Sequence, residues 1–315
     1  MQSPLHRRRF LSSVLGAAGL AATAPFTQPA SAQGRVMRAR GTRVRLALNA
    51  YSFNEPLRAG TTTLDDLVDF CAEHGLDGLD ATGYYFPGYP KVPDEAFLHR
   101  LKRRAFVNGV TISGTGVRND FAVADPAARQ RDVQMVKEWI EVAATLGAGV
   151  VRIFSGLKVP DGGTFERTLD WMIPDITACV DHGRRHGVIV GLQNHHDFVK
   201  TADETIRIVE AVNSEWFGVI LDIGSLRQGD PYAEIEKLVP YAVSWQLKEN
   251  VWYGPKEVRT DVGRVKAIID KAGYRGFLPI ETLGPGDPRV KVPRFLAEVR
   301  RAFAAPPPLS SAAGG

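Results

Sequence analysis

The sequence predicts a single-domain α/β protein, a (β/α)₈ barrel of the TIM type, over residues 43–303. Two observations carry this prediction. From residue 43 onward, short apolar or β-branched runs alternate with longer amphipathic runs, and this happens eight times. No internal linker or charge block suggests a second domain. A doubly wound open sheet is the main alternative, but it usually has fewer strands, and no G-x-G-x-x-G follows the first strand here.

The eight predicted strands are apolar runs that end in polar or turn-forming residues. Runs such as "VIVGLQN" and "FGVILDI" have the length and the β-branched content of buried parallel strands. In chain order they cover residues 43–49, 76–82, 110–116, 149–155, 188–194, 217–223, 242–248 and 276–282.

The predicted helices between and after these strands have recognisable starts and stops. "TTLDDL" and "TADETI" are typical of capped helix starts with acidic residues in the first turn, and two prolines follow an aspartate as they do just inside a helix. Glycines follow several helical runs, as expected of C-terminal caps. The eight helices are expected to begin near Thr63, Pro93, Pro126, Thr164, Thr201, Pro231, Val258 and Arg289.

Both ends of the chain have compositions that set them apart from the barrel. Residues 1–32 combine the basic run Arg7–Arg8–Arg9, a short apolar stretch and an "ASA" cleavage site, which resembles a twin-arginine export signal. We therefore expect a periplasmic or secreted protein with no stable membrane anchor; an uncleaved anchor is the alternative. Residues 304–315 lack periodicity and are expected to be disordered.

The charge balance gives little support for a nucleic-acid partner. The chain has 39 basic and 35 acidic residues, and removing the three arginines of residues 1–32 leaves 36 basic against 35 acidic. The two cysteines, Cys71 and Cys179, both fall in predicted helices. Two buried free thiols are expected, with a single disulfide as the alternative.

The barrel prediction also indicates where a functional site would form, because active sites of this fold lie at the C-terminal ends of the strands. Four consecutive strands, the fifth to the eighth, each end in an oxygen-bearing side chain, and the seventh adds a lysine two residues after its glutamine. Buried carboxylates should be paired or bind a cation. These side chains are Gln193, Asp222, Gln246, Lys248 and Glu281.

Each of these residues has a plainer interpretation. Asp222 is also in the place of a helix cap, and Lys248 could pair with Glu249.

His195 is expected to point the same way as Gln193. Other strands contribute Tyr51 and Arg152, and an aromatic loop over residues 81–90 contains Tyr84, although such loops more often serve packing.

The last four strands resemble those of the sugar phosphate isomerase/epimerase family, the xylose isomerase-like TIM barrels. Members typically carry "ENH", "LD-G", "H-KD" and "G-L-IE" where this chain has "QNH" at residues 193–195, "LDIG" at 221–224, "QLKE" at 246–249 and "GFLPIE" ending at Glu281. "RIFSG" at 152–156 and "DPYAEIEKLVPYA" before the seventh strand are also similar to that family.

The resemblance implies one divalent metal, Mn²⁺ or Mg²⁺, with Gln193, Asp222, Gln246 and Glu281 in the ligand positions. Two of these depart from the family's glutamate and histidine. A glutamine carbonyl still ligates hard cations, but the set has lost one negative charge. The alternative is a metal-free pocket in which the two glutamines hydrogen-bond Asp222 and Glu281.

The resemblance further implies proton transfer next to a carbonyl. Gln193 cannot accept a proton, so one-base chemistry is expected, with Glu281 as the base and Lys248 or the metal stabilising the enediolate oxygen. His195 would donate a hydrogen bond or act as an acid. The residues expected to bind substrate are Tyr51, Tyr84, Arg152, His195 and Glu249.

Three functions remain open. An isomerase or epimerase of a free sugar or keto-sugar is the leading one, since phosphorylated sugars are mainly cytoplasmic. A lyase that cleaves a keto-glycoside would use the same enolate chemistry with one base. A carbohydrate-binding protein without catalysis is the third. A homo-oligomer is expected from the family.

Overall fold

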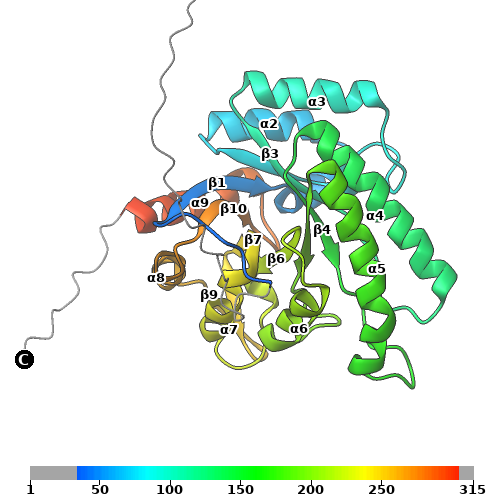
Figure 1. Ribbon diagram of the computed structural model, residues 1–315. Coiled ribbons are helices and arrows are strands. Elements are labelled where there is room, and N and C mark those ends of the chain that lie inside the picture. Colours follow the sequence, from blue (N-terminus) through cyan, green and yellow to red (C-terminus); the bar gives the residue numbers. More distant parts are fainter. Residues whose placement is uncertain (1–33, 305–315) are drawn as a thin grey trace, which may run out of the picture. The chain divides into compact units, whose positions relative to one another are not determined.

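Eight parallel strands close into a barrel in the computed structural model, which describes residues 34–304 (Figure 1). The order around the barrel is β1-β10-β7-β6-β5-β4-β3-β2. The strands are β1 (Arg43–Asn49), β2 (Gly78–Thr82), β3 (Thr111–Gly116), β4 (Val150–Phe154), β5 (Ile189–Gln193), β6 (Phe217–Asp222), β7 (Ala242–Lys248) and β10 (Arg275–Glu281). The predicted fold class is confirmed, and each predicted strand overlaps an observed one.

Closure depends on the first and last strands. Six residue pairs join β1 to β10, from Arg43 opposite Arg275 to Leu48 opposite Ile280. On its other side β10 pairs with β7, which sets Glu281 opposite Lys248. The direct pairing of β7 with β10, its neighbour around the barrel, therefore places these two residues side by side, although a separate hairpin lies between the two strands in the chain.

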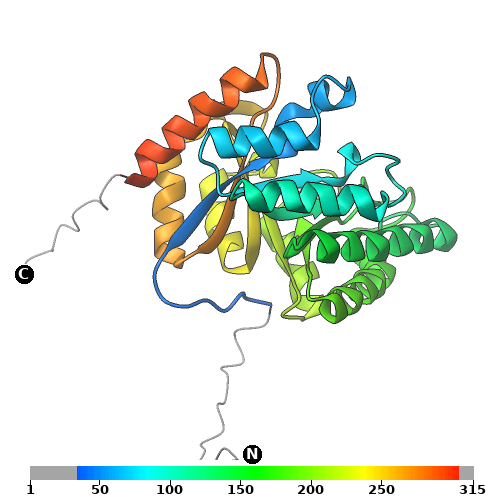
Figure 2. The ribbon, with the colours of Figure 1, turned by 90° about the horizontal axis from the view of Figure 1, so that it is seen from above.

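The helices lie around the outside of the strands, as Figures 1 and 2 show. They are α1 (Asn54–Arg58), α2 (Leu64–Glu73), α3 (Glu95–Val107), α4 (Pro126–Leu146), α5 (Phe165–His186), α6 (Ala202–Val212), α7 (Pro231–Leu238), α8 (Val262–Ala272) and α9 (Pro288–Ala304). None of the helices within residues 34–304 combines the length and the apolar character needed to cross a bilayer.

Local sequence accounts for most helix boundaries. Thr63 and Thr201 form capping boxes at the starts of α2 and α6, and each Oγ accepts a hydrogen bond from the third backbone N–H of its helix. At the ends of α4, α5 and α8 the C-cap is a glycine with a left-handed backbone conformation.

The segment after β7 differs from the prediction. The sequence pattern places the start of the next helix near Val258, but α8 begins at Val262. The preceding residues form an antiparallel hairpin of β8 (Asn250–Tyr253) and β9 (Lys256–Arg259). A two-residue turn joins the strands, and its first residue, Gly254, has a φ of 61°, as this kind of turn requires.

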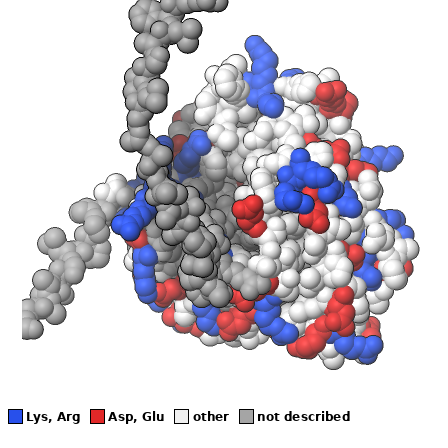
Figure 3. Space-filling model, viewed as in Figure 1, with Lys and Arg blue, Asp and Glu red and all other residues white. Residues whose placement is uncertain are grey.

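The core is built from the apolar faces of strands and helices, with Leu48, Leu79 and Trp139 among the fully buried side chains. Cys71 and Cys179 are buried free thiols, as predicted. On the face shown in Figure 3, acidic and basic side chains are interspersed. The predicted export signal and the predicted disordered tail beyond Ala304 lie outside the described residues.

Candidate active site

Polar side chains converge at the C-terminal ends of β5, β6, β7 and β10. Each of these strands is apolar until its last inward positions, so its terminal polar side chain is carried to the same end of the barrel. Gln193, Asp222, Gln246 and Glu281 are each at most 5% exposed there. The structure thus brings together all four residues that the sequence predicted for this end.

Asp222 is the centre of this cluster, and both of its carboxylate oxygens have partners. Oδ2 accepts hydrogen bonds from Gln193 Nε2 and Ser225 Oγ, both at 2.8 Å, and lies 3.3 Å from Lys248 Nζ. Oδ1 accepts a hydrogen bond at 3.0 Å from the backbone N–H of Gly224. Each carboxylate oxygen offers about two acceptor positions, so Oδ2 is fully engaged and Oδ1 keeps one position open.

Lys248 bridges the two carboxylates of the site. Its Nζ donates a hydrogen bond at 2.9 Å to Glu281 Oε1 and lies 3.3 Å from Asp222 Oδ2. The aliphatic stem passes directly over Gly224, where an added Cβ would lie 2.5 Å from Lys248 Cδ. Lys248 was predicted to reach Glu249 if its role were structural, but its partners are Asp222 and Glu281.

Electrostatics keeps this cluster ionised. Burial alone would lower the pKa of the Lys248 ammonium, but the charges of Asp222 and Glu281 outweigh it, and the pKa lies well above its usual value. Burial would likewise raise the pKa of the Asp222 carboxyl. The charge of Lys248, with His195 and the hydrogen bonds from Ser225 and Gln193, reverses that effect and lowers the pKa. Near neutral pH, Lys248 is therefore a cation and not a nucleophilic amine.

The two glutamines and Asp222 are connected by hydrogen bonds. Gln193 Nε2 donates to Asp222 Oδ2 and also to Gln246 Oε1, both at 2.8 Å. An ionised carboxylate only accepts, so the amide nitrogen of Gln193 must face Asp222. This arrangement partly matches the metal-free alternative, because Gln193 does bond Asp222, while Lys248 is the partner of Glu281.

The donor set does not fit the divalent metal predicted from the family resemblance. Asp222 Oδ2 already has three partners, and Gln193 presents N–H groups to the cluster. An ammonium already lies between the two carboxylates that would supply the charge.

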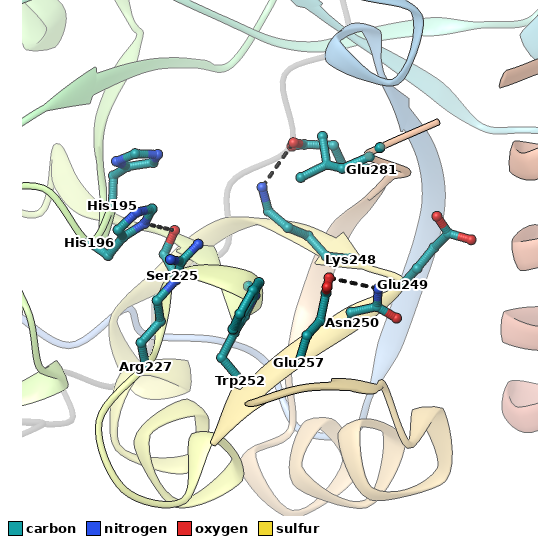
Figure 4. A pocket seen from close by; sticks show the side chains of 13 residues that line it. His195, His196, Ser225, Arg227, Lys248, Glu249, Asn250, Trp252, Glu257 and Glu281 are labelled. Atoms are coloured by element: carbon teal, nitrogen blue, oxygen red, sulfur yellow. Dashed lines mark hydrogen bonds and ion pairs between the residues drawn. The ribbon is translucent and has the colours of Figure 1, made fainter. Parts of the chain in front are cut away.

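Two adjoining cavities open at this end of the barrel, with volumes of about 300 Å³ and about 190 Å³. They share the lining residues His195, Lys248, Glu281 and Leu283. Figure 4 shows the larger cavity, with the lysine extending toward Glu281. The pair formed by Lys248 and Glu281 therefore lies where the two cavities meet.

The smaller cavity is lined by three residues predicted to bind substrate, Tyr51, Tyr84 and Arg152. Arg152 donates hydrogen bonds to the Tyr84 hydroxyl at 2.8 Å and to the Val117 carbonyl at 2.5 Å. Its guanidinium also lies 4.3 Å from the centre of the Phe154 ring. These contacts hold Arg152 rigidly at the cavity wall.

His195 lines both cavities, as predicted, and stacks on His196, which points into the larger one (Figure 4). Its Nδ1 lies 2.9 Å from Asp197 Oδ2, although the angle does not make a hydrogen bond. Burial, followed by the charges of His195 and Arg227, lowers the pKa of His196. The larger cavity is therefore lined by His196 in its neutral form near pH 7.

Glu249, the last predicted substrate-binding residue, lies at the edge of the larger cavity. Its carboxylate is engaged by three cations, with Arg259 Nη1 at 3.1 Å and Arg294 Nη2 at 3.9 Å from Oε1, and Lys291 Nζ at 3.4 Å from Oε2. Its side chain is therefore occupied by these ion pairs and points away from Lys248 in Figure 4.

Several site residues were missed by the sequence interpretation. Asp80, at an inward position of β2, is buried in the barrel beside Asn49, whose Nδ2 donates to it at 3.2 Å. Its position near a strand end was a usable signal. Arg227 and Trp252 line the larger cavity, but they lie on a loop and on the unpredicted hairpin, where no strand register points to them.

A separate group of possible metal donors lies on the outer helices. Glu141 of α4 and His182 and His186 of α5 place three donor atoms within 4.8 Å of one another. His182 Nε2 lies 3.0 Å from Glu141 Oε1. None of the three lines either cavity of the barrel end.

A family model described as the xylose isomerase-like TIM barrel matches residues 68–299. Comparison with curated proteins gave no match. Among solved structures, D-psicose 3-epimerase from Clostridium cellulolyticum H10, with D-tagatose, has a TM-score of 0.67 and 14% identity, and the match covers 83% of this chain and 100% of that one.

Two other solved structures are similar. The 3-keto-D-glucoside 4-epimerase YcjR from E. coli has a TM-score of 0.65 and 12% identity, with 82% of this chain and 99% of that chain covered. The IolI protein, whose structure contains a zinc atom, has a TM-score of 0.65 and 16% identity, with coverages of 82% and 96%. At these identities the likeness shows the shared fold.

Proposed function

The chain belongs to the xylose isomerase-like TIM barrel family, and we propose that it is a sugar isomerase or epimerase that transfers a proton at the carbon next to a carbonyl. The observation that carries this proposal is the contact between Glu281 and Lys248 where the two cavities meet. A carboxylate and a fixed cation side by side are the base and the electrophile that enolisation needs.

In the proposed mechanism, Glu281 removes the proton from the carbon beside the carbonyl. The electron pair moves onto the carbonyl oxygen, and the Lys248 ammonium stabilises the resulting enediolate. For an aldose–ketose isomerisation, the hydroxyl proton passes from the adjacent oxygen to the former carbonyl oxygen, and the carbon-bound proton returns to the former carbonyl carbon. For an epimerisation, a proton returns to the opposite face of the same carbon and the carbonyl re-forms. His195 is the proposed donor for that second face. No step is assigned to a divalent metal, because the donor set does not fit one.

A free sugar or keto-sugar remains the proposed substrate. The proteins with similar structures include one that acts on a 3-keto-D-glucoside and one determined with D-tagatose. The periplasmic or secreted location and the twin-arginine route are also proposals, and they rest on residues 1–32 alone. A homo-oligomer is a further proposal, and it rests on the family resemblance.

One observation favours a lyase as the second candidate. Gln193 stands where the family carries a second carboxylate, so the carboxylate base for the opposite face is missing from this position. In a keto-glycoside lyase, Glu281 would take the proton, the C–O bond to the β-substituent would break, and the departing alkoxide would be protonated by water or His195. This sequence needs only one base.

The test is to incubate the purified protein with keto-sugars and 3-keto-glycosides in D₂O. Deuterium uptake at carbon without loss of a group supports the isomerase or epimerase, and release of the aglycone supports the lyase. Sugar binding with neither reaction would leave the protein a carbohydrate-binding module and overturn both.

The Glu281→Gln variant tests the assigned base. It should lower the exchange rate by roughly 10²–10⁴-fold, the range typical of a general base. The control is Glu210→Gln, since Glu210 accepts a hydrogen bond from Tyr241 outside the cavities. A Glu281→Gln variant that retains its full rate would remove Glu281 from the mechanism.

A further inference from the structure

Three potential metal donors from two neighbouring helices meet on the outside of the barrel. The helices α4 and α5 pack against each other and run side by side in Figures 1 and 2. Glu141 lies near the C-terminal end of α4, and His182 and His186 lie within the last two turns of α5. These three residues, the outer cluster, take no part in the proposed reaction.

The four-residue spacing of the two histidines puts both imidazoles on one face of α5. Their rings stack with centroids 4.5 Å apart and an interplanar angle of 29°. Both Nε2 atoms approach the same oxygen of Glu141, Oε1, at 3.0 Å for His182 and 4.0 Å for His186. Two imidazole nitrogens and one carboxylate oxygen are therefore directed at one another from two helices.

The spacing of these three atoms is close to what a zinc ion requires. Zinc bonds imidazole nitrogen and carboxylate oxygen at about 2.0–2.2 Å, which puts the ligand atoms of a tetrahedral site about 3.4 Å apart. The Nε2–Oε1 distances of 3.0 Å and 4.0 Å lie on either side of that value. The His182 side chain is only 16% exposed and is held in place, whereas those of Glu141 and His186 are 56% and 35% exposed and have room to turn toward an ion.

The charges around the outer cluster also suit a cation. Within residues 34–304, no lysine or arginine forms an ion pair with Glu141, whose partners are the two histidines. His186 is the last residue of α5, where the unpaired carbonyl groups of the final turn carry partial negative charge. The carboxylate and this helix end together favour a divalent ion.

Arg185 is an opposing charge, and its contact identifies the tautomer of His182. Arg185 Nη2 lies 3.3 Å from His182 Nδ1, and an arginine only donates, so the ring proton is on Nε2 and faces Glu141 Oε1. A metal ion on Nε2 requires the proton on Nδ1 instead. Arg185 is exposed, so binding would exchange one exposed hydrogen bond for a metal bond.

We propose that Glu141, His182 and His186 bind a zinc ion that joins the C-terminal parts of α4 and α5. Two imidazoles and one carboxylate suit Zn²⁺ and related transition metals, while Mg²⁺ and Ca²⁺ prefer sets made of oxygen alone. Three protein ligands leave the fourth position for water.

The position of the outer cluster indicates a structural role for the ion. His186 comes shortly before the start of β5, whereas Gln193 is the last residue of that strand. The ion would therefore lie at the end of the barrel opposite the candidate active site, the end where residues serve stability. It would hold two helices together and would not act in the proposed reaction.

Zinc binding can be measured by calorimetry on the purified protein after treatment with chelator. The outer cluster should bind about one Zn²⁺ per chain with a Kd of about 10 µM or lower. About a hundredfold excess of Mg²⁺ should not compete. Co²⁺ in place of zinc should give the visible absorption of a tetrahedral ion, which reports on coordination directly.

Two variants remove one ligand each. His186→Gln and Glu141→Gln should each weaken zinc binding by about tenfold or more, since even the loss of an outer-shell partner costs 10–100-fold. The matched control is His99→Gln. His99 Nε2 lies 3.5 Å from Glu95 on the exposed face of α3, and among the described residues this pair belongs to no group of three donors. Its loss should leave the affinity unchanged.

Thermal unfolding tests the structural role. Zinc at about 100 times its Kd should raise the Tm of the unchanged protein by roughly 5 °C, and His186→Gln should abolish this rise. A Kd above about 1 mM for the unchanged protein would overturn the proposal without any variant.

The variants separate the outer cluster from other sources of bound zinc. Equal zinc binding by His186→Gln and the unchanged protein would overturn the proposal, as would zinc that is lost on Asp222→Asn and kept in His186→Gln. Neither result depends on whether an isomerase, epimerase or lyase activity is found.

Discussion

Asp80 shows how one buried side chain affects the whole protein. Its carboxyl lies inside the barrel, and burial raises its pKa to about 6, with Arg152 opposing this effect and Glu281 adding to it. In the unfolded chain an aspartate titrates near 3.9. The native state therefore binds a proton more readily than the unfolded state between these values, and the ionised form of Asp80 is destabilising.

We predict that Asp80→Asn increases the free energy of unfolding at pH 8 by up to about 3 kcal/mol, because folding raises the pKa of Asp80 from near 3.9 to about 6. For the unchanged protein, the stability contributed by protonated Asp80 is present below about pH 4 and is lost as pH rises through about 6. Chemical denaturation from pH 4 to 8 measures this.

In the Asp80→Asn variant, the part of the pH dependence of stability that comes from Asp80 should be absent. Asp94→Asn is the control, because Asp94 is an exposed N-cap of α3 and asparagine caps equally well. An Asp80→Asn variant that is less stable than the unchanged protein at pH 8 would contradict the prediction and give Asp80 an ionised structural role.

At the scale of single elements, caps and turns decide where helices and strands begin and end. The Thr63 capping box is a local arrangement in which Thr63 Oγ1 accepts from Asp66 N at 3.2 Å and Asp66 Oδ2 accepts from Thr63 N at 2.8 Å. The β8–β9 hairpin is set by its Gly-Pro turn in the same local way. It carries Trp252 into the larger cavity, so the hairpin contributes to the site as well as to the fold.

We predict that Thr63→Ala lowers the free energy of unfolding by about 1 kcal/mol, because the first turn of α2 loses its cap. Activity should not change, since α2 does not reach the cavities. Urea denaturation measures the effect. The control, Thr61→Ala, removes an exposed hydroxyl two residues earlier and should change stability by less than about 0.5 kcal/mol. Equal losses for both variants would refute a special role for the cap.

At the scale of the whole molecule, barrel closure assembles the site from distant segments. The Lys248–Glu281 pair joins β7 to β10, and the Gln193–Asp222 bond joins β5 to β6. Each strand contributes one or two groups, and none of them forms a site alone. Closure also buries these groups together, which is why the ion pairs form in a place of low solvent access.

Much of this could be predicted from the sequence because it depends on short-range patterns. Strand periodicity located all eight barrel strands, and the inward positions at their ends identified Gln193, Asp222, Gln246 and Glu281. Helix starts followed from caps within a few residues. The β8–β9 hairpin was missed because four-residue strands give a weak periodic signal, and its residues were assigned in part to the following helix.

The sequence by itself determined which chemical groups reach the C-terminal barrel end, since strand alternation and the eightfold repeat settle which side chains face inward. Only the tertiary structure decided how these groups pair. Lys248 contacts Asp222 and Glu281 in preference to Glu249, and Gln193 turns its N–H toward Asp222, because distances across strands and the space above Gly224 select the partners. Those distances arise from barrel closure and have no local sequence signal.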